Sequence, residues 1–189
     1  MSDTQWPRYE VFKQEAPGQP HRSIGTVHAP DPEMALMVAR DVHVRRPDCA
    51  SLWVAPAEDI LSMTADELAA NPHWAAEEIP AGAVTQTYHV FFKTTQRRAL
   101  TFVAHAGDVR ARTPREALRL GMERFPAPEV FVWWVCPAGA VMRSEPGVEE
   151  SWFAPARDKT YKQQARYVDV GIVRPRAGTA GDEDDPDAD

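Results

Sequence analysis

The chain has 189 residues, with 21 Lys and Arg against 28 Asp and Glu, and a net charge of −7. Six of the acidic residues lie at positions 177–189, which leaves 22 acidic against 21 basic residues in the rest of the chain. Because that remainder is nearly neutral and its basic residues are scattered, the composition argues against a nucleic-acid-binding protein. The acidic tail has no large apolar residue to bury, and we expect it to be disordered.

The N-terminal part of the chain begins with two predicted strands. Residues 9–14 have strand character, residues 16–20 carry turn residues, and residues 23–29 are predicted to return as the second strand of a hairpin. Asp31 is placed to cap a helix that has Pro32 at its first position, where the missing N–H of proline costs nothing.

That helix has one apolar face at helical spacing and is expected to end before Pro47. The residues predicted to form the face are Ala35, Val38, Ala39 and Val42. Residues 51–55 then read as a short strand, so the order of elements is ββαβ.

Between this unit and the next part of the chain, Ile60–Leu68 is predicted to be a short helix with Thr64 as its cap. A linker follows.

The same order recurs about eighty residues later. Four phrases are matched, at offsets of 79, 82, 82 and 81 residues. The matches are Tyr9–Phe12 with Tyr88–Phe91, Thr26–Ala29 with Asp108–Ala111, Asp31–Leu36 with Thr113–Leu118, and Leu52–Pro56 with Trp133–Pro137. A period of this length is too long for a solenoid repeat and indicates duplication of a small domain.

The second copy carries clearer signals. Thr113-Pro-Arg-Glu116 reads as a capping box, and the helix that follows is predicted to be lined by Ala117, Leu118, Leu120, Met122 and Phe125. Residues 130–136 form an unbroken apolar run, which predicts a strand covered on both faces.

The predicted fold is α+β, with two tandem ββαβ units, each a small antiparallel sheet with one helix packed on it, and an irregular C-terminal arm. The predicted boundaries are 1–70 for the first unit, 71–84 for the linker, 85–150 for the second unit, 151–176 for the arm and 177–189 for the tail.

A search for catalytic motifs returns none. The sequence has no Glu-x-x-His, His-Glu-x-x-His, Gly-x-Ser-x-Gly, Walker or Gly-x-Gly-x-x-Gly motif. Cys49 and Cys136 lack the spacing of a zinc site or of a disulfide framework, and we interpret them as buried thiols in a reducing compartment. The N-terminus has no signal-peptide pattern and no apolar run spans a membrane, so we expect a cytoplasmic protein.

The six histidines are His21, His28, His43, His73, His89 and His105. In the repeat, His28 is matched by Arg110 and His89 by Glu10, a variation typical of solvated strand positions. We therefore predict no metal ligand or catalytic base among the histidines, no catalytic residue and no cofactor.

The aromatic residues divide into two groups. Trp53 and Trp134 are matched in both copies and are interpreted as core. Trp6-Pro7 and Trp152-Phe153-Ala154-Pro155 are harder to place in a core of this size, and Trp is enriched at the energetic centres of protein interfaces. We expect these two segments to contact a partner.

These residues also carry a family resemblance. The segments Trp6–Phe12, His21-Arg22, Gly25–Ala29, Met34–Leu36, Ala39–Asp41, Arg45-Arg46 and Leu52–Ala57 resemble the B subunit of the phenylacetyl-CoA epoxidase complex, the PaaB family. Phe153-Ala-Pro-Ala-Arg-Asp-Lys-Thr-Tyr161 is similar to the ending of that family. The usual member has about half this length and one copy of the unit, so the second copy is a departure.

The resemblance implies a structural role in aerobic phenylacetate degradation. In that family's complex, a di-iron catalytic subunit oxidises the aromatic ring of phenylacetyl-CoA, an inactive ferritin-like subunit supports it, and a flavin and iron–sulfur reductase supplies electrons. The small family member links the two helical subunits and has no chemistry of its own. The partner interface predicted for this chain comprises Trp6, Pro7, Tyr9, Trp152, Phe153, Pro155, Asp158, Lys159 and Tyr161.

The duplication suggests that the two halves pair within one chain about a pseudo-two-fold axis, with residues 51–55 covering part of the apolar strand 130–136; a homodimer is the other arrangement considered. Two further functions stay open from the residues. One is a small α+β barrel enzyme or aromatic-ligand-binding protein with Trp53, Trp134, His28 and Arg110 in its pocket. The other, already disfavoured by charge, is a nucleic-acid-binding domain, which retention on heparin would support.

Overall fold

The computed structural model describes residues 5–44, 49–76, 79–95, 103–147 and 149–153. All of them belong to one compact unit, Met1–Lys159, and the remainder, Thr160–Asp189, lies outside the described ranges. The predicted tail and most of the predicted arm are therefore outside the described residues. In the described part of the chain, no helix is long and apolar enough to cross a membrane.

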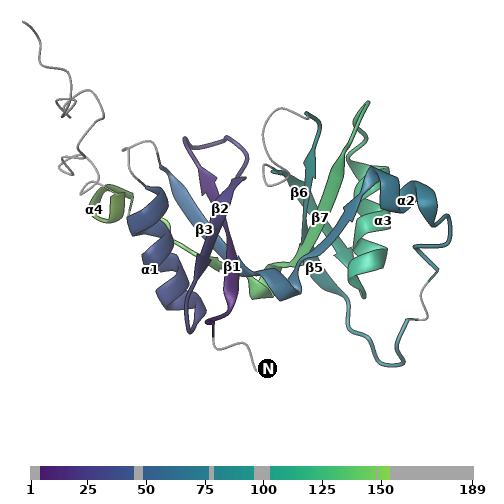
Figure 1. Cartoon of the computed structure of the whole chain (residues 1–189), viewed down its shortest axis with the longest axis horizontal. Coiled ribbons are helices and arrows are strands. Elements are labelled where there is room, and N and C mark those ends of the chain that lie inside the picture. The colour runs from purple at the N-terminus through teal and green to yellow at the C-terminus, as the bar shows by residue number, and fades with distance from the viewer. Residues whose placement is uncertain (1–4, 45–48, 77–78, 96–102, 148, 154–189) are drawn as a thin grey trace, which may run out of the picture. The chain divides into compact units, whose positions relative to one another are not determined.

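Both copies form the predicted elements (Figure 1). The first copy consists of β1 (Arg8–Gln14), β2 (Arg22–His28), α1 (Pro32–His43), β3 (Ser51–Pro56), the 3₁₀ turn η1 (Ala57–Asp59), β4 (Leu61–Thr64) and α2 (Ala65–Ala70). The second consists of β5 (Gln86–Lys93), β6 (Ala104–Ala111), α3 (Pro114–Arg124), β7 (Val132–Pro137), the 3₁₀ turn η2 (Ala138–Ala140), β8 (Met142–Arg143) and α4 (Glu149–Phe153). The predicted α+β class and the ββαβ order are confirmed.

One predicted helix is partly wrong. The segment predicted as a helix over Ile60–Leu68 begins as strand β4, and the helix starts only at Ala65. Thr64 is nevertheless its cap, because the Thr64 Oγ1 atom accepts from the Glu67 N–H and the Glu67 carboxylate accepts from the Thr64 N–H. The strand forms because β7 offers it a free edge, which the local sequence does not reveal.

The strands form a sheet in the order β4-β7-β5-β6-β2-β1-β3-β8. The matched strands of the two copies are β1 and β5, β2 and β6, β3 and β7, and β4 and β8. Exchanging each strand for its match reproduces the same sheet order, read from the opposite edge. The last strand of each copy crosses over: β4 of the first copy pairs with β7 of the second, and β8 of the second copy pairs with β3 of the first. The halves therefore exchange edge strands reciprocally, which is the arrangement expected for a pseudo-two-fold relationship.

Each long helix packs on the sheet of its own copy (Figure 1). Asp31 caps α1 by accepting from the Met34 N–H at 2.8 Å, as predicted. Thr113 caps α3 through the Glu116 N–H, but the Glu116 carboxylate reaches past the cap to the backbone N–H of Arg112, so the predicted capping box is incomplete.

The apolar face of α1 differs from the prediction at one position. Ala35, Leu36 and Ala39 are buried, whereas Val42 is 43% exposed. The helix turns Leu36 toward the strands in place of Val42, and Leu36 joins the core that α1 shares with the first copy's sheet.

A third apolar cluster lies on the sheet face away from the helices. Its buried members are Phe12, Ala55, Phe91, Val103, Val132, Trp134, Cys136 and Val141. Strand β7 contributes alternate residues to this cluster and to the cluster under α3, where Trp133 and Val135 pack. The predicted two-sided burial of this strand is confirmed, and Ala55 of β3 supplies part of the cover, as expected.

Candidate functional site

The predicted partner-contact residues near the N-terminus separate into exposed and buried ones. Trp6 is 61% exposed and Pro7 is also exposed. Tyr9, two residues on from Pro7, is 4% exposed and belongs to the apolar core under α1. Trp6 and Pro7 precede β1, which begins at Arg8, whereas Tyr9 is the first residue of that strand to face the helix. Of these three residues, only Trp6 and Pro7 are open to a partner.

The second predicted segment begins at α4. Phe153 is buried in the core under α1, and Trp152 packs partly buried against the same core, with the Arg40 guanidinium carbon 5.2 Å from its ring centroid. Pro155, Asp158, Lys159 and Tyr161 lie outside the described residues. Phe153 is thus a packing residue, while Trp152 keeps part of its ring accessible.

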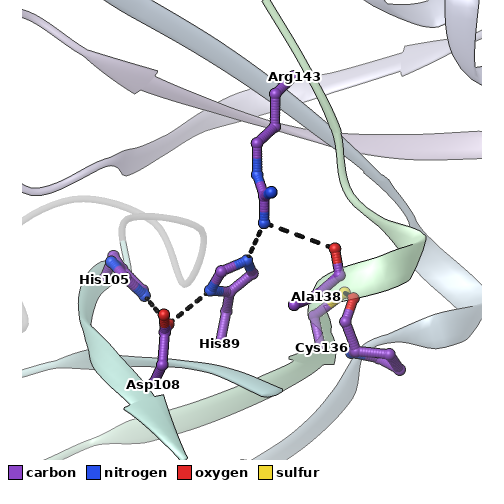
Figure 2. Close-up of polar contacts among 7 residues, drawn as sticks. His89, His105, Asp108, Cys136, Ala138 and Arg143 are labelled. Atoms are coloured by element: carbon purple, nitrogen blue, oxygen red, sulfur yellow. Dashed lines mark hydrogen bonds and ion pairs between the residues drawn. The ribbon is translucent and has the colours of Figure 1, made fainter. Parts of the chain in front are cut away.

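A polar cluster that the sequence did not predict lies between the halves of the sheet (Figure 2). Arg143 Nη2 donates to His89 Nε2, His89 Nδ1 lies 2.6 Å from Asp108 Oδ1, and His105 Nε2 lies 2.9 Å from the same oxygen. Because an arginine can only donate, His89 must accept at Nε2 and carry its proton on Nδ1, which donates to Asp108. The groups form one continuous chain of hydrogen bonds.

Sheet register brings the cluster together. His89 on β5 lies directly opposite Asp108 on β6, and His105 precedes Asp108 by three residues across an irregular step in the β5–β6 pairing. Arg143 comes from the exchanged strand β8, where it pairs with Trp53 of β3. The hydrogen-bond chain therefore ties the second copy's hairpin to the edge of the first copy's sheet.

The Trp53 ring packs against the polar cluster. The His21 ring stacks on it with centroids 3.6 Å apart, and the Arg143 guanidinium carbon lies 5.0 Å from its centroid in a cation–π contact. The Nε2 atom of His21 is buried without a hydrogen-bond partner among the described residues. Trp53 is half-buried and also packs against the apolar cluster, whereas its counterpart Trp134 is a buried member of that cluster, as predicted.

Burial sets the protonation of these groups. It lowers the pKa of His21 to about 3, helped by electrostatic repulsion of a protonated His21 by His105, His89 and Arg143. Burial also lowers the pKa of His89, although the hydrogen bond to Asp108 opposes the effect. For Asp108, burial alone would raise the pKa, but the hydrogen bonds from His89 and His105 outweigh it and lower the pKa. At neutral pH the cluster holds neutral His21 and His89 beside an ionised Asp108.

His89, His105 and Asp108 have the residue types of a metal-binding set, and their ligand atoms lie within 4.8 Å of one another. A metal on His89 Nδ1 would move the ring proton to Nε2, which faces the donor of Arg143. Two donors would then point at each other, and the guanidinium charge would repel the cation. The residues present fit a satisfied hydrogen-bond network better than a metal site.

The sequence interpretation of His89 as a solvated residue is wrong. His89 is 4% exposed, and its counterpart Glu10 is 6% exposed. Both lie on the face of their strand that meets the other half, which local sequence cannot distinguish from a solvent face. The available signal was strand alternation, because Glu10 and His89 each lie two residues before a large aromatic residue of the shared core, Phe12 or Phe91.

The alternative pocket of a small barrel protein is not assembled by the residues proposed for it. His28 and Arg110 are exposed, and Trp134 is packed into the apolar cluster. Of these four residues, only Trp53 borders the polar cluster.

Comparison with known proteins identifies a family and a curated relative. The family model for phenylacetic acid degradation B (PaaB) matches residues 5–78 and again 85–173. The B subunit of 1,2-phenylacetyl-CoA epoxidase from Escherichia coli (strain K12) is 43% identical over 67 residues, which cover 35% of this chain and 70% of the relative. No solved structure matches the chain.

Proposed function

The chain belongs to the phenylacetic acid degradation B family, and from that premise we propose that it is a bridging subunit of a multicomponent phenylacetyl-CoA epoxidase without catalytic chemistry of its own. The observation that carries the proposal is the family match over both copies of the ββαβ unit. The relative from Escherichia coli is itself one subunit of an epoxidase. The proposed partners are a di-iron catalytic subunit and an inactive ferritin-like subunit.

A bridging role is supported by how the polar residues are used. The hydrogen-bond chain through His89 and Asp108 is closed at both ends by groups of this chain, Arg143 and His105. Such a network orders the two halves and leaves its histidines engaged, so it stabilises a scaffold rather than presenting a base to a substrate.

We further propose that this chain takes the place of two single-copy subunits. The matched 67 residues are 35% of this chain but 70% of the relative, so the relative is about half as long. The reciprocal exchange of β4 and β8 gives one chain the two halves that a pair of single-copy chains would otherwise supply.

The test of bridging is co-expression of the full chain with the catalytic and ferritin-like subunits from the same organism, followed by size-exclusion chromatography with mass detection and a phenylacetyl-CoA oxidation assay. We expect the three chains to co-elute, and the assay to lose activity when this chain is omitted. Trp6→Ala should weaken co-elution because its ring is exposed, whereas Val84→Ala, at another exposed apolar position, is the matched control. Elution of the wild-type chain alone would contradict the proposal.

The test of the duplication is the mass of each protein by light scattering. We expect this chain to be a monomer and a single-copy relative to be a dimer. A dimer of this chain at the same concentration would contradict the proposed equivalence without touching the bridging role.

A further inference from the structure

The outer side of helix α1 carries three exposed apolar side chains around the charged Asp41. Met34, Met37 and Val42 are exposed by 42%, 47% and 43%, although each side chain is large and apolar. Isolated exposed apolar residues are ordinary, but here three lie on one twelve-residue helix. Methionine is also the apolar residue that adapts best to a partner surface.

The second copy supplies an internal comparison. At the offset of 82 residues, Met34, Met37 and Val42 correspond to Glu116, Arg119 and Arg124. On α3, Glu116 pairs with Arg112 and Arg119 pairs with Glu123, so that helix presents a charged, solvated face. The same fold position thus tolerates charge, and packing within the chain does not require the apolar residues on α1.

A groove of about 380 Å³ adjoins this side of α1 at Met37. Leu36 and Met37 of α1, Met142 of β8 and Trp152 form its apolar walls, and Glu33 and Glu145 add carboxylates. No ion pair joins either carboxylate to a described residue. Arg143 also borders the groove, but its guanidinium is engaged by His89 and Trp53.

The chain itself covers the corresponding place on α3. Arg115, the counterpart of Glu33, donates from Nη1 to the Trp74 carbonyl oxygen at 2.7 Å. Trp74 and Leu68 pack on the apolar core under α3. In the second copy a basic residue donates to a carbonyl of its own chain, whereas the first copy has an exposed carboxylate, Glu33, at the matched position.

We propose that the outer face of α1 and its groove bind a segment of a partner subunit that presents apolar side chains flanked by Lys or Arg. The apolar residues would pack on Met34, Met37 and Trp152, and the basic residue would pair with Glu33 or Glu145. This inference rests on the proposed bridging function and assigns one of its contact surfaces.

The test grafts the surface of α3 onto α1. The variant Met34→Glu/Met37→Arg places the residue types of α3 at exposed positions of α1, so its circular dichroism and melting temperature should match those of the wild type. Its dissociation constant for the catalytic and ferritin-like subunits, measured by titration calorimetry on full-length chains, should rise by roughly tenfold or more for one of them. Arg119→Gln on α3 is the control and should change neither constant by more than about twofold.

The charge component is tested separately. Glu33→Gln/Glu145→Gln should weaken the same interaction by several fold and make it less sensitive to salt, because screening acts on the ion pairs. Wild-type binding that the α1 variant leaves unchanged would overturn the inference while the bridging function stands. Absence of wild-type binding would overturn both, and loss of self-association in the α1 variant would overturn the inference by assigning the face to a second copy of this chain.

Discussion

Phe12 and Phe91, which occupy matched positions in the two copies, stack on each other with ring centroids 4.5 Å apart and planes inclined by 24°. Each ring comes from the central strand of its own half, β1 or β5. A residue that contacts its own counterpart must lie near the axis that relates the two halves. The stack therefore marks the pseudo-two-fold axis and joins the halves into one core.

Removal of either ring should destabilise the whole protein. Phe91→Ala is expected to cost about 3–5 kcal/mol in the free energy of unfolding, since it leaves a cavity in a fully buried cluster. The double variant with Phe12→Ala should cost less than the two single variants together, by about 0.5–1.5 kcal/mol. Urea denaturation measures both. Phe92 packs on the core under α3, so Phe92→Ala is the control. Its loss of unfolding free energy should add to that of Phe12→Ala without coupling.

Any side chain at Gly107 is expected to lower the stability of the protein. Its φ is +151°, and a Cβ there would lie 2.5 Å from the Phe125 ring, which the end of α3 places over the β5–β6 hairpin. We predict that Gly107→Ala costs about 2 kcal/mol or more from backbone strain and overpacking together. Gly25 is the counterpart, and a Cβ there would lie 2.9 Å from the His43 ring, a smaller overlap than at Gly107, so Gly25→Ala should cost less.

Thermal melts of the two glycine variants check this order. Gly139→Ala, where a Cβ meets no atom within 4 Å, should be close to neutral. If Gly107→Ala and Gly25→Ala lower the melting temperature equally, backbone strain rather than the aromatic neighbour dominates the loss of stability.

Acid should destabilise the protein through His21. Burial lowers its folded-state pKa to about 3, so between its unfolded value near 6.5 and about 3 the unfolded state binds one more proton than the folded state. Stability from this group should therefore fall as the pH falls, with a slope of up to about 1.4 kcal/mol per pH unit. Denaturation at pH 7, 6, 5 and 4 measures the slope.

His21→Phe should reduce that slope. The phenyl ring retains the stack on Trp53 and removes a buried nitrogen that lacks a partner among the described residues. Stability at pH 7 should be unchanged or higher. His28→Gln, at an exposed strand position, is the control, and a slope that persists unchanged in His21→Phe would contradict the assignment.

Arg143 should hold the pKa of His89 down through its charge. Arg143→Gln keeps a donor near His89 Nε2 but removes the positive charge that contributes to the lowered pKa. We expect the pKa of His89, followed by NMR of its ring, to rise in this variant while burial keeps it below that of a solvated histidine. Arg8→Gln, which removes the partner of Glu10 instead, should leave His89 unchanged. A fall in the pKa of His89 would contradict the proposed arrangement.

The sequence by itself determined the repeat, the order of elements in each copy and the family. Local chemistry carried these predictions: Asp31 with Pro32 starts α1, Thr113 with Pro114 starts α3, and the unbroken apolar run of 130–136 requires cover on both faces. Caps, turns and periodicity involve a few neighbouring residues, so they can be recognised in the sequence before the fold is known.

Only the tertiary structure decided which polar residues meet. His89 and Asp108 are opposite each other through strand register, Arg143 reaches them because β8 crosses to the other copy's sheet, and His21 stacks on Trp53 across the sheet. The exchange of β4 and β8 depends on which sheet edge is left open once the halves pair. That choice is made by contacts far apart in the chain, and no local pattern in the sequence encodes it.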